Sequence, residues 1–328
     1  MSEPPRLRGF VVTPGKPPEP ASGWNDLQAN PAAPVSPVPA GRFVWVDVEG
    51  ELDAATSELL QERLGWHPIV VQNIRQASSR ARLTPFEDYT HLVFFDPVAD
   101  DEHPAEIDAV LGPGYLVTFH SSRSPTLDQL FAELPGFKGT PKSPDLLLHR
   151  LVSAAVDATA PRVDAMDDAL AALEEEALAH SGTELLERIV AVRDALFLQQ
   201  LWLAPQLQML HDLTSGASRF VTPYAKPFFR STENRLRGLI DDIATYKEVV
   251  QNILELYRSA ITHKTNETIR VLTVVSTPLL VLSFVTGLYG MNVPLPFAGT
   301  PHAFAALAVL CGVVFLGMLA WFRKRNWF

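Results

Sequence analysis

The sequence predicts a membrane protein with an α/β cytoplasmic domain, long stalk helices and two C-terminal transmembrane helices. Three observations support this fold class. Residues 271–322 contain no Asp, Glu, Lys or Arg. Residues 43–135 alternate between short strand patterns and short helix patterns, whereas residues 145–270 have helical periodicity. Residues 1–270 carry 24 basic and 37 acidic side chains, a net charge of −13, so an acidic part precedes an uncharged tail.

Composition and motifs exclude several classes of protein. The net charge of −10 over 328 residues argues against nucleic acid as a partner. The single cysteine, Cys311, excludes a disulfide framework and a zinc site built on several thiolates. Gly112-Pro113-Gly114 lacks the third glycine of a dinucleotide loop, and Gly-x-Ser-x-Gly and His-Glu-x-x-His are both absent. We therefore expect neither an enzyme nor a bound cofactor.

The first 42 residues form a proline-rich segment, with ten of the 27 prolines in residues 1–40. Leu7–Val12 is expected to be one edge strand, and Pro14–Pro39 an extended, flexible segment. The start, Met-Ser-Glu-Pro-Pro, has no apolar run of the kind found in signal peptides.

Residues 43–144 are assigned to the α/β domain. Apolar alternation typical of strands occurs at Phe43–Val48, His91–Asp96, Glu106–Leu111 and Tyr115–His120. Helical patterns cover Asp53–Leu64, His67–Gln76 and Ser124–Leu134.

Residues 145–270 are assigned to long helices and a stalk. We expect one helix over Asp145–Ala179 and a second over Thr183–His211. A third begins near Phe228 and continues into the first membrane span, so that Ser231–Tyr289 would be about 90 Å long at 1.5 Å per residue. The alternative is two helices, broken near Gly238 or Thr262.

Residues 271–328 are assigned to the membrane part, in which the uncharged segment 271–322 is followed by a basic end. The uncharged segment is long enough for two spans, because a bilayer core needs about 20 apolar residues per helix. The spans are predicted at Val271–Tyr289 and Ala303–Phe322, separated by a Gly- and Pro-rich loop at 290–302. Arg270 and Arg323–Arg325 flank the spans and the loop has no Lys or Arg, which predicts that both termini are cytoplasmic. The alternative is a buried hairpin in a large soluble core.

A stripe of small and polar residues follows one face of the first span, at alternating steps of three and four. It consists of Asn266, Ile269, Thr273, Ser276, Leu280, Ser283 and Gly287. Such a stripe has two interpretations, close helix–helix packing or the lining of a pore. Two spans cannot enclose a channel, so a pore requires several copies of the chain.

Three short motifs occur at the spacing of a known family. Lys264-Thr-Asn-Glu267 precedes the first span, Tyr289-Gly-Met-Asn292 follows it, and Arg323-Lys-Arg-Asn-Trp-Phe328 ends the chain. With Trp45-Val-Asp-Val48, His67-Pro68 and Phe86-Glu-Asp-Tyr89 upstream, the chain resembles the CorA family of divalent-cation transporters over residues 43–328. The resemblance implies a homopentamer in the cell inner (plasma) membrane. Its partners would be the other copies of the chain, the lipid bilayer and the transported divalent cations.

The resemblance also implies roles for individual residues. Gly290, Met291 and Asn292 would form the selectivity filter, and Asn292 and Asn266 would contact the metal through its hydration shell. The pore lining would include Asn266, Thr273, Ser283 and Gly287. The hydrophobic gate would consist of Ile269, Leu272 and Leu280.

The transported ion stays open between two branches of the family. We favour Mg²⁺, together with Co²⁺ and Ni²⁺. The loop after Asn292, however, has no carboxylate. Magnesium-transporting members usually have one there, and in lacking it the loop is similar to the ZntB-like zinc branch. The alternative is therefore a ZntB-like zinc transporter that is coupled to a proton gradient. A membrane-anchored signalling or scaffold protein is the alternative of another class.

A regulatory magnesium site of the family is degenerate in this sequence. In magnesium-gated members an Asp after the His-Pro helix start and an Asp near the top of the stalk hold Mg²⁺ between subunits. The corresponding positions are Asn73 and Ser231, both neutral, unless a shifted alignment brings in Asp241 or Asp242. Because Mg²⁺ prefers carboxylates, we expect this sensor to be missing.

Overall fold

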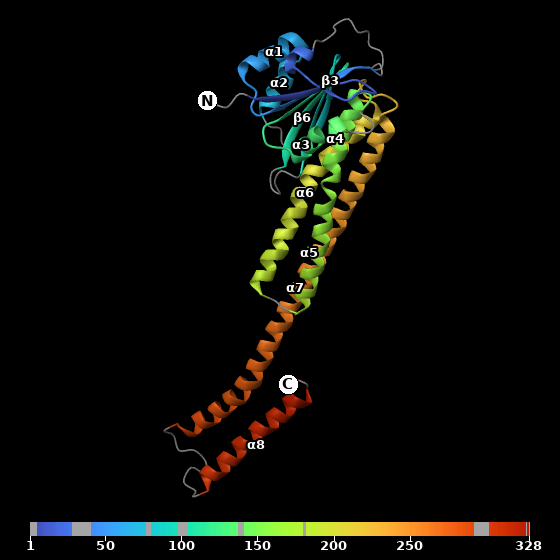
Figure 1. The fold of residues 1–328 in the computed structure, drawn as a ribbon. Helices are drawn as coiled ribbons and strands as arrows, with labels where there is room; N and C mark the ends of the chain where they lie inside the picture. Colours follow the sequence, from blue (N-terminus) through green and yellow to red (C-terminus); the bar gives the residue numbers. More distant parts are fainter. Residues whose placement is uncertain are drawn as a thin grey trace. The chain divides into compact units, whose positions relative to one another are not determined.

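The computed structural model describes residues 5–27, 41–76, 80–97, 104–136, 141–179, 182–291, 302–325 and residue 327. Its contacts divide the chain into two compact units. The first, which we call the sheet unit, comprises residues 1–173 and 187–251, and the second, the span unit, comprises residues 174–186 and 252–328. Each unit is described here by itself (Figure 1).

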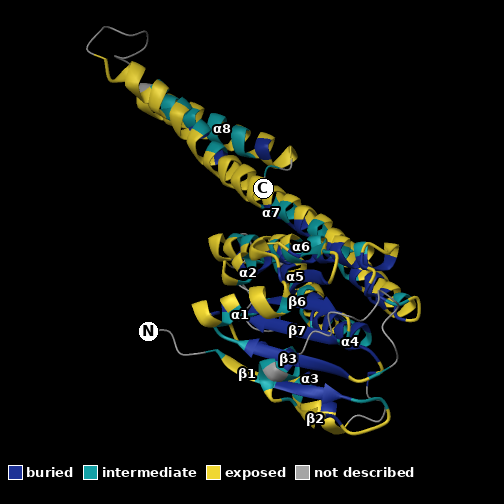
Figure 2. Cartoon of the chain, turned by 90° about the horizontal axis from the view of Figure 1, so that it is seen from above, coloured by how far each residue is buried: buried dark blue, intermediate teal, exposed yellow. Residues whose placement is uncertain are grey.

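The sheet unit is built on a seven-stranded sheet of order β2-β1-β3-β7-β6-β5-β4. Its strands are β1 (Arg6–Val12), β2 (Glu19–Pro20), β3 (Phe43–Glu49), β4 (Arg82–Pro85), β5 (Thr90–Asp96), β6 (Ala105–Gly112) and β7 (Tyr115–His120). Only the pairing of β3 with β7 is parallel, and the other described pairings are antiparallel. The central strands are buried on both faces (Figure 2), which explains why they are nearly continuous apolar runs.

Helices cover both faces of this sheet. One face carries α1 (Ala54–Leu64) and α2 (Pro68–Arg75), which pack with Trp66, Val46, Val117 and Phe119 in one apolar cluster. The helix α1 begins at the cap of Asp53, whose Oδ1 accepts from Thr56 N at 2.7 Å, and ends at Gly65, a residue with φ of 65°. The other face carries α3 (Pro125–Glu133) and α4 (Pro144–Asp157). Short 3-10 turns lie at Gly23–Asp26 and Leu134–Gly136.

The remaining helices are α5 (Ala160–Ala179), α6 (Thr183–Ser215), α7 (Lys226–Tyr289) and α8 (Ala303–Lys324). Within the sheet unit, α6 packs against the end of β5. Trp202 of α6 packs on Phe95 with 4.8 Å between ring centroids, and Gln206 Oε1 accepts from Phe95 N at 3.2 Å. Lys247 Nζ of α7 donates to Gln200 Oε1 of α6 at 2.7 Å.

Most predicted elements are confirmed, with four corrections. The expected helix Asp145–Ala179 is wrong as one piece: it is broken at Ala158–Thr159 into α4 and α5, because Pro161 lacks the N–H needed to continue a helix. β4 was not predicted, since Arg-Leu-Thr-Pro has no apolar alternation. β1 is not an edge strand, because β2 pairs outside it. Pro14–Pro39 is not uniformly extended, because it includes β2 and a 3-10 turn; its residues 28–39 lie outside the described part.

The helix α7 is continuous over 64 residues, so the alternative of a break near Gly238 or Thr262 is wrong. In the span unit, α8 lies beside the last part of α7 in each view (Figures 1 and 2). The connection between α5 and α6 contacts α7 through Tyr257, whose hydroxyl donates to the carbonyl of Gly182 at 3.2 Å. The domain boundaries at residues 42, 144 and 270 stay predictions.

Candidate ion pathway

The stripe predicted from the sequence lies on α7 and is uncovered in the single chain. Of its seven residues, Thr273 is half-buried and the other six are exposed. The less exposed side of the same helix carries Val274, Pro278, Val281 and Val285, which repeat at steps of four, three and four. These four residues lie roughly opposite the stripe on a helix of 3.6 residues per turn. Packing within one chain therefore uses the apolar side of α7 and leaves the stripe free.

The helix α8 has a matching side. Its less exposed residues also recur at steps of three or four: Leu307, Cys311, Val314, Met318 and Phe322. Cys311 is thus a half-buried, free thiol among apolar neighbours of the helix, as expected for a small packing residue. Each of the two helices is thus least exposed along one apolar side, and the stripe belongs to α7 alone.

Two of the three hydroxyl groups of the stripe are turned toward the helix backbone. Thr273 Oγ1 donates to the carbonyl of Ile269 at 2.7 Å, and Ser276 Oγ donates to the carbonyl of Leu272 at 2.6 Å. Because these two hydroxyl protons are used locally, the oxygens of Thr273 and Ser276 offer only lone pairs to whatever lies on the stripe. The stripe therefore presents neutral acceptor oxygens and has no ionisable group between Thr273 and Gly287.

The residues assigned to a hydrophobic gate are on or next to the same side. Ile269, Leu272 and Leu280 are 55%, 66% and 70% exposed in the single chain. Large apolar side chains at this exposure are unfavourable in water, so they need a lipid, a second chain or a constriction around them. Asn266, one turn before Ile269, is exposed as well.

The helix α7 ends where the filter motif begins. Gly290 N donates to Thr286 O at 2.9 Å and Met291 N donates to Leu288 O at 3.3 Å, which closes the last turn. Met291 is 54% exposed. Asn292, to which the family resemblance assigns the central role, lies outside the described residues, as do residues 293–301 of the loop.

The degenerate regulatory positions lie on separate elements of the sheet unit. Asn73 is half-buried on α2, and Ser231 is exposed on the second turn of α7. The two residues do not contact each other in the described hydrogen bonds. Asp241 and Asp242, the substitutes in a shifted alignment, are exposed about three turns further along α7.

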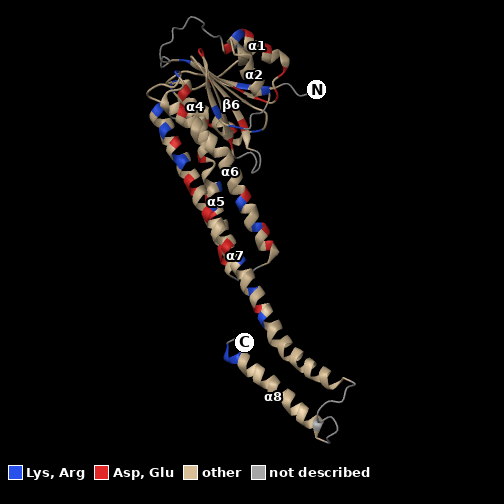
Figure 3. Cartoon of the chain, turned by 180° about the vertical axis from the view of Figure 1, so that it is seen from behind, with Lys and Arg blue, Asp and Glu red and all other residues tan. Residues whose placement is uncertain are grey.

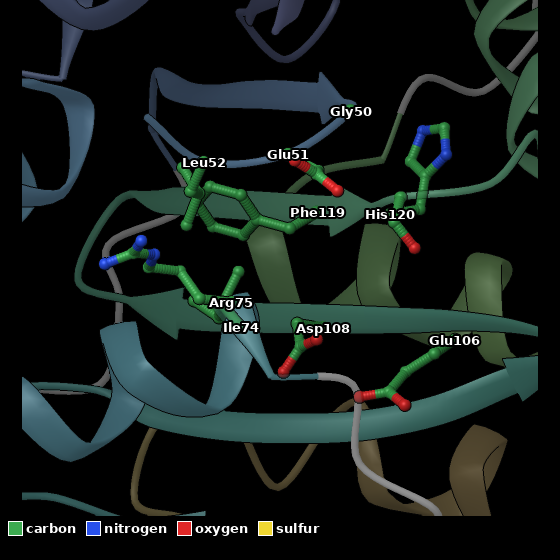
Figure 4. A pocket seen from close by; sticks show the side chains of 10 residues that line it. Gly50, Glu51, Leu52, Ile74, Arg75, Glu106, Asp108, Phe119 and His120 are labelled. Atoms are coloured by element: carbon green, nitrogen blue, oxygen red, sulfur yellow. The ribbon is translucent and has the colours of Figure 1, made fainter. Parts of the chain in front are cut away.

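A polar cavity of about 320 Å³ opens at the carboxyl ends of β3 and β7 (Figure 4). Glu51 and Asp108 are among the residues that line it, and the His120 ring is turned away from both of their carboxylates. Asp108 is held at its Oδ1 by His91 Nε2 at 2.7 Å. No group of three or more His, Cys, Asp or Glu side chains that could hold a metal ion is found among the described residues, so the cavity is not assigned as a metal site.

A buried charge network that the sequence analysis did not predict ties β1, β3, β7 and α3 together. Asp47 is fully buried; it accepts from Arg8 Nε at 2.8 Å, from the Thr118 hydroxyl and from His120 Nε2 at 3.3 Å. Arg8 also donates to Asp128 Oδ1 at 2.7 Å. The residues are scattered over the sequence, and the only available signal was an Asp inside the apolar run of β3.

The network shifts the acidity of its members. Burial alone would raise the pKa of Asp47, but the hydrogen bond and charge of His120, the Thr118 bond and the Arg8 charge hold it below its usual value. Burial would lower the pKa of His120, but the hydrogen bond and charge of Asp47 raise it above its ordinary value. Each of the two side chains therefore stabilises the charged form of the other.

Comparison with known proteins identifies the family. The model of the CorA-like Mg²⁺ transporter protein family matches residues 40–324. This chain belongs to the CorA family. The match confirms the resemblance found in the sequence, and it agrees with a transporter rather than an enzyme. The two helices long and apolar enough to span a membrane are α7 and, over Phe304–Lys324, α8, so the chain is a membrane protein with two C-terminal transmembrane helices.

Individual CorA-family proteins are similar over nearly the whole chain. The cobalt/magnesium transport protein CorA of Thermotoga maritima is 24% identical over 290 residues, 86% of this chain and 83% of that protein. The complete structure of the CorA magnesium transporter from Methanocaldococcus jannaschii has a TM-score of 0.81 at 20% identity and covers 98% of both chains. Full-length CmaX has a TM-score of 0.76 at 21% identity, covering 98% of this chain and 97% of that one.

A third structural likeness concerns the zinc branch. The cytoplasmic domain of ZntB from Vibrio parahaemolyticus has a TM-score of 0.59 at 18% identity, with 79% of this chain and 99% of that chain covered. At this identity the likeness shows a shared fold only. The comparisons therefore confirm the fold class, an α/β domain with long helices and a C-terminal helical hairpin. Which divalent cation is transported has to be argued from the residues of the pathway.

Proposed function

We propose that the chain forms a homopentameric pore that carries hydrated Mg²⁺, and also Co²⁺ and Ni²⁺, across the plasma membrane. The observation that carries this proposal is the uncovered stripe of α7, which offers neutral acceptor oxygens opposite the less exposed, apolar side of the helix. One chain with two spans cannot surround an ion, so the stripe needs copies of itself around an axis. Two relatives, both named cobalt/magnesium transport protein CorA, support the choice of Mg²⁺ and Co²⁺.

The chemistry of the stripe suits a hydrated divalent cation. Mg²⁺ loses its waters reluctantly, and the hydrogens of those waters point outward. Oxygens that have already donated their own protons to the backbone can accept from this shell without stripping it. Carboxylates in the same place would hold the ion too tightly for release. The membrane potential supplies about 4.6 kcal/mol per 100 mV for a divalent ion moving inward.

In this proposal the pathway has three sections. Gly290, Met291 and Asn292 form the outer filter, with one Asn292 amide from each copy contacting the hydrated ion. Thr273, Ser283 and Gly287 line the pore with Asn266 at its inner end. Ile269, Leu272 and Leu280 form the hydrophobic gate between the polar rings. The termini lie in the cytoplasm, and the degenerate pair Asn73 and Ser231 leaves gating to a signal other than Mg²⁺ between subunits.

Zinc transport is the second candidate, and one specific observation favours it. The loop from Val293 to His302 contains no carboxylate and contains a histidine, which suits a softer metal better than Mg²⁺. Proton coupling would accompany this candidate. The scaffold alternative predicts no ion flux at all.

The test is ion uptake into proteoliposomes that contain the full chain. Mg²⁺, Co²⁺ and Zn²⁺ are each measured with and without a proton gradient, for the wild type, for Asn292→Ala and for the matched control Asn252→Ala. Asn252 is exposed on α7, outside the span and the filter. We expect Asn292→Ala to abolish uptake at unchanged oligomer size and the control to retain it. Undiminished uptake in Asn292→Ala contradicts the filter, and a pentamer excluded by the mass of the detergent-solubilised complex contradicts the pore.

A further inference from the structure

Five basic side chains lie close to one end of the two spans, and we call them the basic band: Lys264, Arg270, Arg323, Lys324 and Arg325. All five are exposed. The segments that carry them, 261–270 and 323–325, contain a single acidic residue, Glu267, so their net charge is +4 in each chain. The rest of the chain has a negative net charge, so the basic band is a positively charged region in an acidic protein.

The band marks a membrane surface. The charges begin where the uncharged segments end, at Arg270 before Val271 and at Arg323 after Phe322. Because α7 and α8 run in opposite directions, these two points lie at the same end of the span unit, where the ribbon in Figure 3 is coloured blue for Lys and Arg. The uncharged parts, residues 271–289 and 303–322, are about 28 and 30 Å long, which matches the hydrocarbon core of a bilayer.

The C-terminal turn holds aromatic and cationic groups together at this level. The Arg325 guanidinium lies 5.6 Å from the ring centroid of Trp321, which is 54% exposed. Phe322 is buried between its neighbours, with ring centroids 5.2 Å from Trp321 and 5.4 Å from Trp327. The turn is fixed by the backbone, since Trp327 N donates to Phe322 O and Arg325 N donates to Trp321 O, both at 3.1 Å.

Within the described part of the chain, no observed ion pair joins the basic band to a carboxylate. Among the described residues, the ion pairs involve other arginines and histidines and none of the five. Exposed cations held beside an interfacial tryptophan and a membrane span are instead placed at the depth of lipid headgroups. A guanidinium matches a phosphate with two parallel hydrogen bonds, which an ammonium cannot do.

We propose that the basic band binds the phosphate groups of anionic phospholipids in the membrane surface at this end of the spans. The occupant is a lipid rather than an acidic peptide, because the cations continue directly from two membrane spans and one of them, Arg325, lies over the exposed indole ring of Trp321. The proposal depends on the membrane spans and is independent of which ion is transported. Binding fixes the depth of α7 and α8 in the bilayer from both helices at once.

The proposal is tested by lipid binding to the full chain in detergent, without an ion gradient. Phosphatidylglycerol and phosphatidylcholine are titrated separately, and bound lipid is counted by native mass spectrometry. The variants are Arg323→Gln/Lys324→Gln/Arg325→Gln and the matched control Arg63→Gln/Lys142→Gln/Arg230→Gln, whose residues are exposed in the sheet unit. The charge-preserving Arg323→Lys/Arg325→Lys shows whether the C-terminal turn tolerates substitution.

We expect wild type to bind phosphatidylglycerol in preference to phosphatidylcholine. Each basic residue removed should weaken this preference about fivefold, hence about 100-fold for the triple variant, while the control and the Lys variant keep most of it. Equal binding by the triple variant and wild type overturns the proposal, and so does an equal loss in the control. Complete displacement of phosphatidylglycerol by millimolar inorganic phosphate would show a small-anion site and overturn the lipid assignment. Since no flux is measured, failure here leaves the pore proposal standing, and the reverse also holds.

Discussion

Replacing Asp47 by Asn tests the reasoning about the buried charge network. Asp47 is 0% exposed and accepts hydrogen bonds from Arg8, Thr118 and His120. An amide of the same shape keeps one acceptor oxygen but removes the charge that both cations face. Removing one partner of a buried ion pair costs about 3–5 kcal/mol. Because Arg8 keeps Asp128 at 2.7 Å, we expect the lower end, about 3 kcal/mol.

This free energy converts into a measurable change of the melting temperature. For domains of about 150–250 residues, 1 kcal/mol corresponds to about 2–4 °C, so Asp47→Asn should melt about 6–12 °C lower. The assay is thermal unfolding of the full chain in detergent, followed by tryptophan fluorescence, because Trp45 Nε1 donates to Thr118 Oγ1 in the same network.

The matched control for this prediction is Asp241→Asn, an exposed carboxylate on α7. Exposed substitutions usually change stability by less than about 0.5 kcal/mol, so the control should melt within about 2 °C of wild type. A decrease of less than about 3 °C for Asp47→Asn would refute the assignment of the network as a stabilising feature. Uptake per folded protein should be the same in both variants, since neither residue lies on the stripe.

Three further predictions concern pH, topology and regulation. The pKa of His120 is raised above 6.5, so its contribution to stability is full below pH 6.5 and is lost as the pH rises through the raised pKa. The variant His120→Gln should therefore lose this part of the pH dependence of the melting temperature. An unchanged pH profile in the variant would contradict the prediction. A cysteine at Ala298 should react with an impermeant thiol reagent from outside the cell, and labelling only from inside would rule out the pore topology. Mg²⁺ at low millimolar concentration on the cytoplasmic side should leave uptake open, because Asn73 and Ser231 supply no carboxylate; closure that is lost on substitution of either residue would show that the site is intact.

The sequence by itself determined the elements with strong patterns. The four central strands β3, β5, β6 and β7 are apolar runs because both of their faces are covered, and such runs are visible without a structure. The two spans were equally visible, because a bilayer excludes charge and residues 271–322 contain none. The stripe followed from helical spacing alone, and short motifs at fixed distances from the spans indicated the CorA family.

Only the tertiary structure decided which groups meet. Arg8, Asp47, Thr118, His120 and Asp128 come from four elements, and sheet order brings them together, which no local pattern encodes. Strand β4 was missed for a related reason: its pairing with β5 supplies the stability that its own residues lack. That the stripe is uncovered in the single chain also needed the structure, because spacing defines the sides of α7 but only the exposure of its residues shows which side is open.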